Sequence, residues 1–102
     1  MDTIFAPLTL KGKCSIYVIR ISGKLVKECL KNLGVNRHLK HREATLCVLK
    51  DEHGNPIDEA LVIYFESPNS FTGEDIVELN LHCSNYIISK ITSILLSIKG
   101  VR

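Results

Sequence analysis

The chain has 102 residues, of which 45% are hydrophobic and 24% are charged, and its formal net charge at neutral pH is +2. This length and apolar fraction fit one folded domain with a single core, and they exclude a disordered chain or a pair of domains. The longest apolar stretch, residues 86–98, is interrupted by Lys90 and is shorter than the roughly 18 residues that a membrane span needs, so we expect none.

The N-terminal part of the chain predicts two strands. The first strand lies near the N-terminus, a loop follows at residues 11–13, and the second strand runs from about residue 15 to residue 21. In the second strand Ile16, Val18 and Arg20 share one face, because side chains alternate along a strand. This pattern puts an arginine where a core residue is expected.

A helix is predicted next, in SGKLVKECLKNLG at residues 22–34. Ser22 is a candidate N-cap, and Gly34 stands where a helix is expected to stop. Apolar residues recur between them at helical spacing, at positions 25, 26, 29, 30 and 33. We expect an amphipathic helix that packs on a sheet.

A hairpin and a loop follow. ATLCVLK at residues 44–50 and IDEALVIYF at residues 57–65 are typical of strands, and DEHGNP at residues 51–56 favours the turn between them. SPNSFTG at residues 67–73 predicts a loop because it is rich in Pro, Asn, Ser and Gly.

The last elements are a strand at residues 75–83 and a helix. The strand alternates between an apolar face (Val77, Leu79 and Leu81) and a polar face (Glu78, Asn80 and His82). Ser84 is expected to cap a helix from about Asn85 to Lys99, which Gly100 ends. The element order β, β, α, β, β, β, α predicts an α+β domain: a mixed or antiparallel sheet of about five strands with two main helices on one face.

No nucleotide-binding loop is present in the sequence. GKCS at residues 12–15 and SGKL at residues 22–25 each contain a Gly-Lys pair, but neither has a glycine at the position where a phosphate-binding loop requires it. We therefore expect no nucleotide site of this type in the chain.

The basic connection NRHLKHR, at residues 36–42, has two functional interpretations. His38 and His41 have a spacing that can ligate a metal on a helix, but no Cys or carboxylate follows at a suitable interval, so we predict no metal site. Arg37, Lys40, Arg42 and nearby Lys31 can contact RNA phosphates, although no aromatic residues are interleaved for base stacking. A solvated basic loop is the simpler interpretation.

The polar face of the 75–83 strand also has two interpretations. It is either the solvated face of an antiparallel sheet or a binding site. If Arg20 lies on a neighbouring strand, its guanidinium and the Glu78 carboxylate offer complementary donors and acceptors to a flat heteroaromatic ligand. The competing interpretation is a cross-strand ion pair that contributes little to stability.

The loop before this strand has mainly structural features. In TGED, Thr72 can cap the following turn, Asp75 can return the bond as in a capping box, and Gly73 permits a left-handed backbone. Adjacent Glu74 and Asp75 are expected to point apart, so we predict no catalytic residue here.

Compartment is predicted from the N-terminus and the cysteines. The N-terminus lacks the basic start and continuous apolar core of a signal peptide, so we expect a cytoplasmic protein. Cys14, Cys29, Cys47 and Cys83 contain no closely spaced pair, and we expect reduced, mostly buried thiols.

Residues 68–82, PNSFTGEDIVELNLH, closely resemble the signature PNSFTGEDVVEIxxHGG of the N-terminal domain of the MnmE (TrmE) family of tRNA-modifying GTPases. VIRISG at residues 18–23 resembles a second motif of that domain. DTIFA at residues 2–6 and IDEALVIYF at residues 57–65 occur in the same order and at similar spacing. The resemblance therefore covers essentially the whole chain.

The resemblance implies a fold like that of folate-dependent aminomethyltransferases, which forms a homodimer and binds 5-formyl-tetrahydrofolate or 5,10-methylene-tetrahydrofolate. By motif position, the folate-contacting arginine and glutamate of the family correspond to Arg20 and Glu78. Asn80 and His82 are further candidates, expected to support these two residues. The whole chain, residues 1–102, is then a single folate-binding and dimerisation domain that ends before the helical and GTPase domains.

For full-length relatives, the resemblance implies a role in tRNA processing. They add an aminomethyl or carboxymethylaminomethyl group to the wobble uridine together with an FAD-dependent partner, MnmG (GidA). GTP, Mg²⁺ and K⁺ belong to the GTPase domain, so we expect no GTP hydrolysis by this segment alone. The folate is expected to supply the one-carbon unit.

The sequence departs from the family pattern in three places. LKGKCS at residues 10–15 replaces a glycine-rich segment, and His82, Cys83 and Ser84 stand where the family has HGG. The chain also ends at Arg102, before a downstream segment whose lysine completes the folate site in the family. Two further outcomes therefore stay open: a domain that only dimerises, without a complete folate pocket, and a small RNA-binding module.

Overall fold

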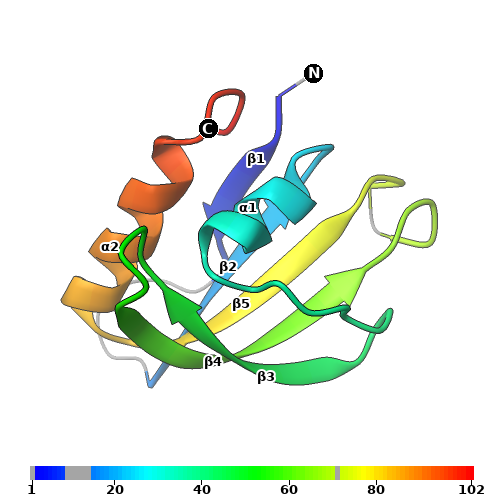
Figure 1. The fold of residues 1–102 in the computed structure, drawn as a ribbon. Coiled ribbons are helices and arrows are strands. Elements are labelled where there is room, and N and C mark those ends of the chain that lie inside the picture. Colours follow the sequence, from blue (N-terminus) through cyan, green and yellow to red (C-terminus); the bar gives the residue numbers. More distant parts are fainter. Residues whose placement is uncertain (1, 9–14, 71) are drawn as a thin grey trace.

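A computed structural model of the chain describes residues 2–8, 15–70 and 72–102 (Figure 1). Within these residues, five strands form an antiparallel sheet in the order β1-β2-β5-β4-β3, and two helices follow β2 and β5. The elements are β1 (Ile4–Pro7), β2 (Ile16–Ser22), α1 (Val26–Asn32), β3 (Ala44–Lys50), β4 (Pro56–Phe65), β5 (Ile76–His82) and α2 (Asn85–Leu96). The predicted α+β class and the predicted element order are confirmed. The loop expected at residues 11–13 lies outside the described residues.

One face of the sheet carries the core. Both helices pack on this face, and α1 lies in front of the sheet in Figure 1. The inward side chains of the four strands β2 to β5 and those of the two helices form one buried cluster. Its fully buried members include Ile21, Val26, Leu49, Val62, Val77, Leu79, Leu81, Ile91 and Leu95. The apolar face predicted for the last strand is therefore confirmed as the core face.

Ile16, Val18 and Arg20 share one face of β2, as predicted, but this face is not the core face. In β2 the buried side chains are Tyr17, Ile19 and Ile21, whereas Arg20 shares the opposite face with Val18 and the exposed Ile16. Both faces of this strand carry β-branched apolar residues, so the alternation alone does not tell which face the helices cover. The outward face of the sheet is therefore the one that carries the arginine.

Helix α1 begins later than expected. Ser22 is the last residue of β2 and not an N-cap; Leu25 holds the N-cap position and makes no side-chain cap. The Leu25 N–H instead donates to Oγ1 of the buried Thr3, at 2.9 Å. Gly23 makes this approach possible, because a Cβ at its φ of 142° would lie 2.5 Å from that same oxygen.

Helix α2 confirms the predicted N-cap and is shorter than expected. The Ile87 N–H donates to the Ser84 Oγ at 3.4 Å, and the helix ends at Leu96 rather than Lys99. In the described part of the chain, neither helix has the length and apolar character to cross a membrane.

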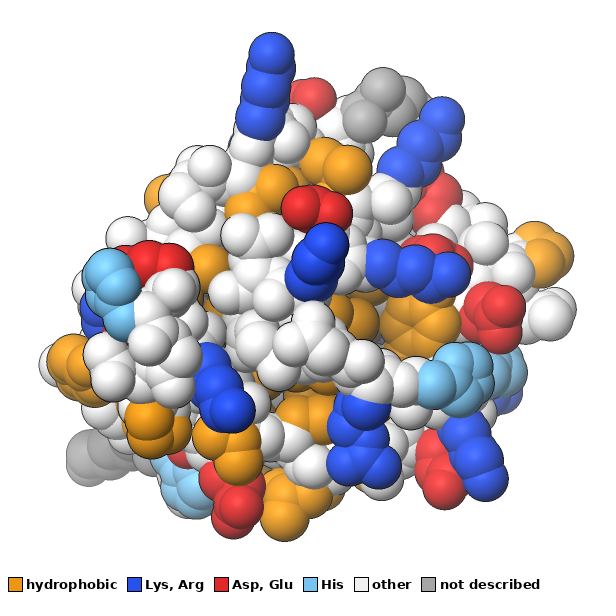
Figure 2. All heavy atoms as spheres, viewed as in Figure 1, with side chains coloured by type: hydrophobic (Ala, Val, Ile, Leu, Met, Phe, Trp, Pro, Cys, Tyr) orange, Lys and Arg blue, Asp and Glu red, His pale blue; other side chains and the backbone are white. Residues whose placement is uncertain are grey.

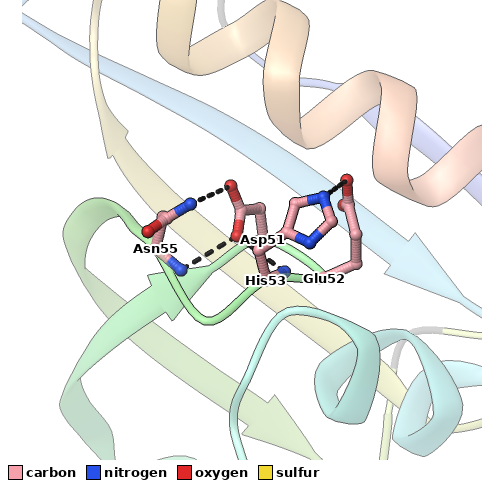
Figure 3. Close-up of polar contacts among 4 residues, drawn as sticks. All are labelled: Asp51, Glu52, His53 and Asn55. Carbon is pink, nitrogen blue, oxygen red and sulfur yellow. Dashed lines mark hydrogen bonds and ion pairs between the residues drawn. The ribbon is translucent and has the colours of Figure 1, made fainter.

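The β3–β4 turn is held by Asp51 (Figure 3). Its Oδ1 accepts hydrogen bonds from the backbone N–H groups of His53 and Asn55, both at 2.9 Å. These bonds, the one from Asn55 first, lower the pKa of Asp51. His53 and Glu52 face each other at 3.5 Å but are largely exposed. This polar cluster has a structural role, and it confirms the predicted turn.

The prediction of reduced thiols holds for two of the cysteines. Cys29 and Cys47 are free and buried, and burial beside Glu28 raises the pKa of the Cys29 thiol to about 11. The prediction is wrong for Cys83, which is disulfide-bonded, because spacing along the chain does not show which thiols meet in space. Cys14 lies outside the described residues.

Candidate functional site

Arg20 and Glu78 form the centre of the candidate site. They lie directly opposite each other on β2 and β5, so the adjacency assumed from the sequence is confirmed. The Arg20 Nη2 and Nε donate to the same carboxylate oxygen, Glu78 Oε2, at 2.6 and 3.1 Å. The two side chains are 32% and 16% exposed, so the pair is held by the sheet yet reachable from solvent.

The turn of the signature, around Thr72, borders this pair on one side. The hydroxyls of Ser22 and Thr72 lie 3.0 Å apart, and Ser22 is on the same face of β2 as Arg20, two residues further on. Two residues of a strand span roughly 7 Å, so residues near Thr72 lie one step from the arginine. Ile76, at this end of β5, is fully buried. The loop therefore forms one edge of the site.

Asn80 borders the pair on the other side. It lies opposite Val18 on β2 and Leu61 on β4, and its Nδ2 donates to the Leu61 carbonyl at 3.1 Å. This bond ties the Asn80 side chain to the sheet backbone and fixes its orientation next to Glu78.

His82 is not brought to the Arg20–Glu78 pair. It is four residues from Glu78 along an extended strand, roughly 13 Å away. Its Nδ1 lies 2.7 Å from Asp58 Oδ1, and its backbone N–H donates to Asp58 Oδ2 at 2.9 Å. The His82 ring is 71% exposed, whereas the Asp58 side chain is only 6% exposed.

Asp58 is a residue that the sequence did not single out. An aspartate near the start of a strand is visible in the sequence, but its partner is not. The pairing of β4 with β5 brings Asp58 beside His82. Without that pairing the residue is indistinguishable from one more polar side chain near a turn.

The surroundings of the pair are apolar. Six of the large hydrophobic side chains that stay exposed lie, by strand alternation and register, on the same face as Arg20: Ile4, Leu8, Ile16, Leu46, Val48 and Leu61. No helix of the described residues covers this face, because both pack on the other one. We refer to this outward surface of the sheet as the open face.

The loop at residues 66–75 is organised by its own hydrogen bonds. Thr72 Oγ1 accepts from the Glu74 N–H at 3.3 Å, which agrees with the predicted capping of the turn, and Gly73 has the predicted left-handed φ of 80°. Asp75 does not close a capping box with Thr72; its Oδ1 accepts from the Ser67 N–H at 2.9 Å. The bond joins the two ends of the loop, because Ser67 follows β4 and Asp75 precedes β5.

Asp75 and Tyr64 influence each other beneath this loop. Burial acts to raise the pKa of Asp75, but the Ser67 N–H, the nearby Tyr64 hydroxyl and Lys27 lower it by more. Burial, followed by the Asp75 carboxylate, raises the pKa of Tyr64. The carboxylate is close enough for this effect, yet no group lies in hydrogen-bonding geometry with the buried Tyr64 hydroxyl.

The two histidines of the basic connection have different surroundings. The His41 Nδ1 accepts a hydrogen bond from the Glu66 N–H at 2.8 Å and joins the connection to the end of β4. His38 is exposed beside α1. Among the described residues, no group of three metal-ligating side chains is close enough to hold a metal ion.

Among the described residues, the chain is an antiparallel α+β domain with an Arg–Glu pair on the sheet face that the helices leave open. Comparison with known families is more specific: residues 3–102 match the family described as "GTP-binding protein TrmE N-terminus". The chain belongs to this family. The resemblance found in the sequence is therefore confirmed.

Three curated relatives show how far the similarity extends. The chain is 47% identical over 91 residues to the "tRNA modification GTPase MnmE" of Ehrlichia chaffeensis and 49% identical over 87 residues to that of Anaplasma phagocytophilum, covering 89% and 85% of this chain. It is 40% identical over 101 residues, 99% of the chain, to the protein of the same name from Mannheimia succiniciproducens. The matched region spans about a fifth of each relative, 21%, 20% and 22% respectively.

Proposed function

We propose that this chain acts as the N-terminal, tetrahydrofolate-binding domain of a tRNA modification GTPase. The observation that carries the proposal is the Arg20–Glu78 pair, held on adjacent strands of an uncovered sheet face beside the signature loop. Family membership and the similarity to tRNA modification GTPases support the wider role in tRNA modification.

The chemistry of the pair suits a pterin-like ring. Such a ring presents neighbouring N–H donors and a carbonyl acceptor along one edge, and a carboxylate and a guanidinium are complementary to these groups. Glu78 accepts from the ring N–H groups, Arg20 donates to the carbonyl or to the ligand's carboxylate, and apolar neighbours such as Val18 and Ile63 contact the ring surface. Bound 5-formyl- or 5,10-methylene-tetrahydrofolate supplies a one-carbon unit.

Asn80 has a positioning role in this proposal. Because its amide is bonded to the Leu61 carbonyl, it keeps the β4–β5 backbone in register next to Glu78. His82 lies at the rim, oriented by Asp58, and contacts at most a distal part of the ligand.

Wobble-uridine modification belongs to the whole protein rather than to this domain. The relatives are about five times longer than the matched region, so GTP with its Mg²⁺ and K⁺, the tRNA and an FAD-dependent MnmG partner are assigned to the complete assembly. The domain contributes ligand binding and assembly.

A homodimer through the open face is the second part of the proposal. Exposed apolar patches of this kind mark interaction sites on soluble proteins, and the open face gathers six large hydrophobic side chains around a polar pair. We propose a second copy of the chain as its occupant. Sedimentation velocity showing a dimer that Leu61→Asp converts to a folded monomer supports this; a wild-type monomer at all concentrations contradicts it.

Calorimetric titration with 5-formyl-tetrahydrofolate tests ligand binding. Arg20→Ala and Glu78→Gln are each expected to weaken binding about tenfold or more, because each removes a charged hydrogen-bonding partner. Glu59→Gln is the matched control. Glu59 is an exposed glutamate of β4 and lies on the open face, like Arg20 and Glu78. Its affinity is expected to stay within about twofold of wild type.

Two results contradict the folate assignment. One is equal binding by wild type, Arg20→Ala and Glu78→Gln. The other is an absence of binding both by this chain and by a longer form that contains it, in which case a dimer observed by sedimentation leaves assembly as the sole role of the domain.

A further inference from the structure

Charge is unevenly distributed along this nearly neutral chain. Residues 24–42, which comprise α1 and the connection after it, contain six Lys and Arg and one acid, Glu28, for a net charge of +5. The remainder contains seven Lys and Arg and ten Asp and Glu, for a net charge of −3. The basic side chains of this segment are all exposed: Lys24, Lys27, Lys31, Arg37, Lys40 and Arg42.

The fold gathers these charges around a hollow. A pocket of about 410 Å³ lies between α1 and the connection, with Lys27, Lys31, Arg37 and His38 among its lining residues. Lys27 and Lys31 are four residues apart, so they project from the same side of α1. Figure 2 shows Lys and Arg side chains around apolar surface on this face of the molecule.

The floor of the pocket is apolar and aromatic. Leu30, Val35, Leu39 and Tyr64 line it, and Glu66 is the single acid among the lining residues. Beneath it, the Tyr64 hydroxyl is the one buried side-chain polar atom in the described ranges that lacks a hydrogen-bonding partner. A cationic rim above an apolar floor is suited to an anion that carries a flat apolar part.

We propose that α1 and the basic connection at residues 36–42 form an RNA-binding site, in which Lys27, Lys31 and Arg37 hold backbone phosphates and the pocket receives one nucleotide. The basic segment is larger than the pocket, because its exposed residues Lys24, Lys40 and Arg42 are not among the lining residues, and this favours a polyanion over a single free nucleotide. The choice of RNA over other polyanions rests on the proposed role in tRNA modification. The site itself rests on the charges and the pocket.

This site is separate from the Arg20–Glu78 pair. Lys27 and Lys31 belong to the helix that covers the core face, whereas Arg20 and Glu78 point from the open face. Both sites can therefore be occupied at once. Of the large hydrophobic side chains left exposed in the described ranges, none belongs to residues 24–42, which disfavours an anionic membrane as the occupant.

Fluorescence anisotropy with a labelled tRNA transcript tests the proposal. Lys31→Glu and Arg37→Glu are each expected to weaken binding about tenfold and to reduce the slope of log affinity against log salt by about 1 or more. Lys99→Glu is the matched control, because it makes the same change of charge at an exposed position outside the segment. It is expected to change affinity by no more than about twofold.

Several outcomes overturn the proposal. If Lys99→Glu weakens binding equally, RNA affinity depends only on the total charge of the protein. If RNA affinity is insensitive to salt, or to Lys31→Glu and Arg37→Glu, these residues do not contact phosphates. Tighter binding of phosphatidylserine vesicles or of polyglutamate than of RNA assigns the surface to another partner. Circular dichroism confirms that each variant is folded, and unchanged folate affinity in the same variants separates a failure of this site from a failure of the folate assignment.

Discussion

The two faces of the sheet are built from the same strands and serve different purposes. Along β5, Val77, Leu79 and Leu81 are fully buried under the helices, whereas Glu78 is only partly covered and is paired with Arg20. The packed core fixes the positions of the strand backbones, and the strand backbones fix the positions of Arg20 and Glu78 on the other face. An open face of an antiparallel sheet can therefore hold a charged pair in a fixed geometry without a cavity of its own.

The open face is also apolar where a merely solvated face would be polar. Ile16, Leu46 and Leu61 are each about half exposed, at 54%, 54% and 46%. Simple alternation of buried and solvated residues does not account for them. Their exposure favours a surface that is covered in the assembled protein.

A matched pair of leucine variants gives the largest expected effect. Leu79→Ala removes a fully buried side chain from β5 and is expected to destabilise the domain by about 2–5 kcal/mol. Leu61→Ala, on the neighbouring strand and the open face, is expected to cost less than about 1 kcal/mol in the monomer. Urea denaturation followed by circular dichroism measures the free energy of unfolding of both variants. Equal losses of stability would show that the two faces do not differ in their contribution to the core.

A double-mutant cycle on Arg20 and Glu78 gives an intermediate effect. Because the pair is partly screened by solvent, its coupling free energy is expected to be about 1 kcal/mol, and smaller at high salt. The cycle compares Arg20→Ala, Glu78→Ala and the double variant by denaturation. A coupling near zero would mean that the pair is not held together in solution and that the open face is not preorganised.

Asp75→Asn gives the smallest effect, and it depends on pH. Since the pKa of Asp75 is lowered in the folded state, the carboxylate stabilises the domain above its ordinary pKa of 3.8, and this contribution is lost as the pH falls through the folded value. The variant is expected to be less stable than wild type at pH 7 by about 0.5–1 kcal/mol. The gap closes in acid; a gap that persists at pH 2 contradicts this account.

Much of the fold follows from sequence periodicity. The hairpin around residues 51–56, the two faces of β5 and the cap at Ser84 are local features, so they are predictable from neighbouring residues alone. The faces of β2 are not predictable in this way, because apolar residues occupy both of them and only the helix packing decides which is covered. Ser22 likewise fits a cap by composition but is used by the strand.

The candidate site is predictable only in part. Alternation places Glu78, Asn80 and His82 on one face, yet the pairing of Glu78 with Arg20 depends on a register between strands 58 residues apart in sequence. The same long-range register separates His82 from the pair and gives it Asp58 as a partner. The pocket beside α1 also escapes sequence analysis, because it forms where a helix and a connection meet.

Backbone amide chemical-shift mapping with 5-formyl-tetrahydrofolate tests whether the Arg20–Glu78 pair binds the ligand. Saturable shifts are expected to be largest at the outward positions of β2 and β5, around Val18, Arg20 and Glu78, and at the bordering loop near Thr72, with residues 24–42 little changed. Saturable shifts confined to residues 24–42, or shifts that survive unchanged in Glu78→Gln, would show that the pair does not bind the ligand.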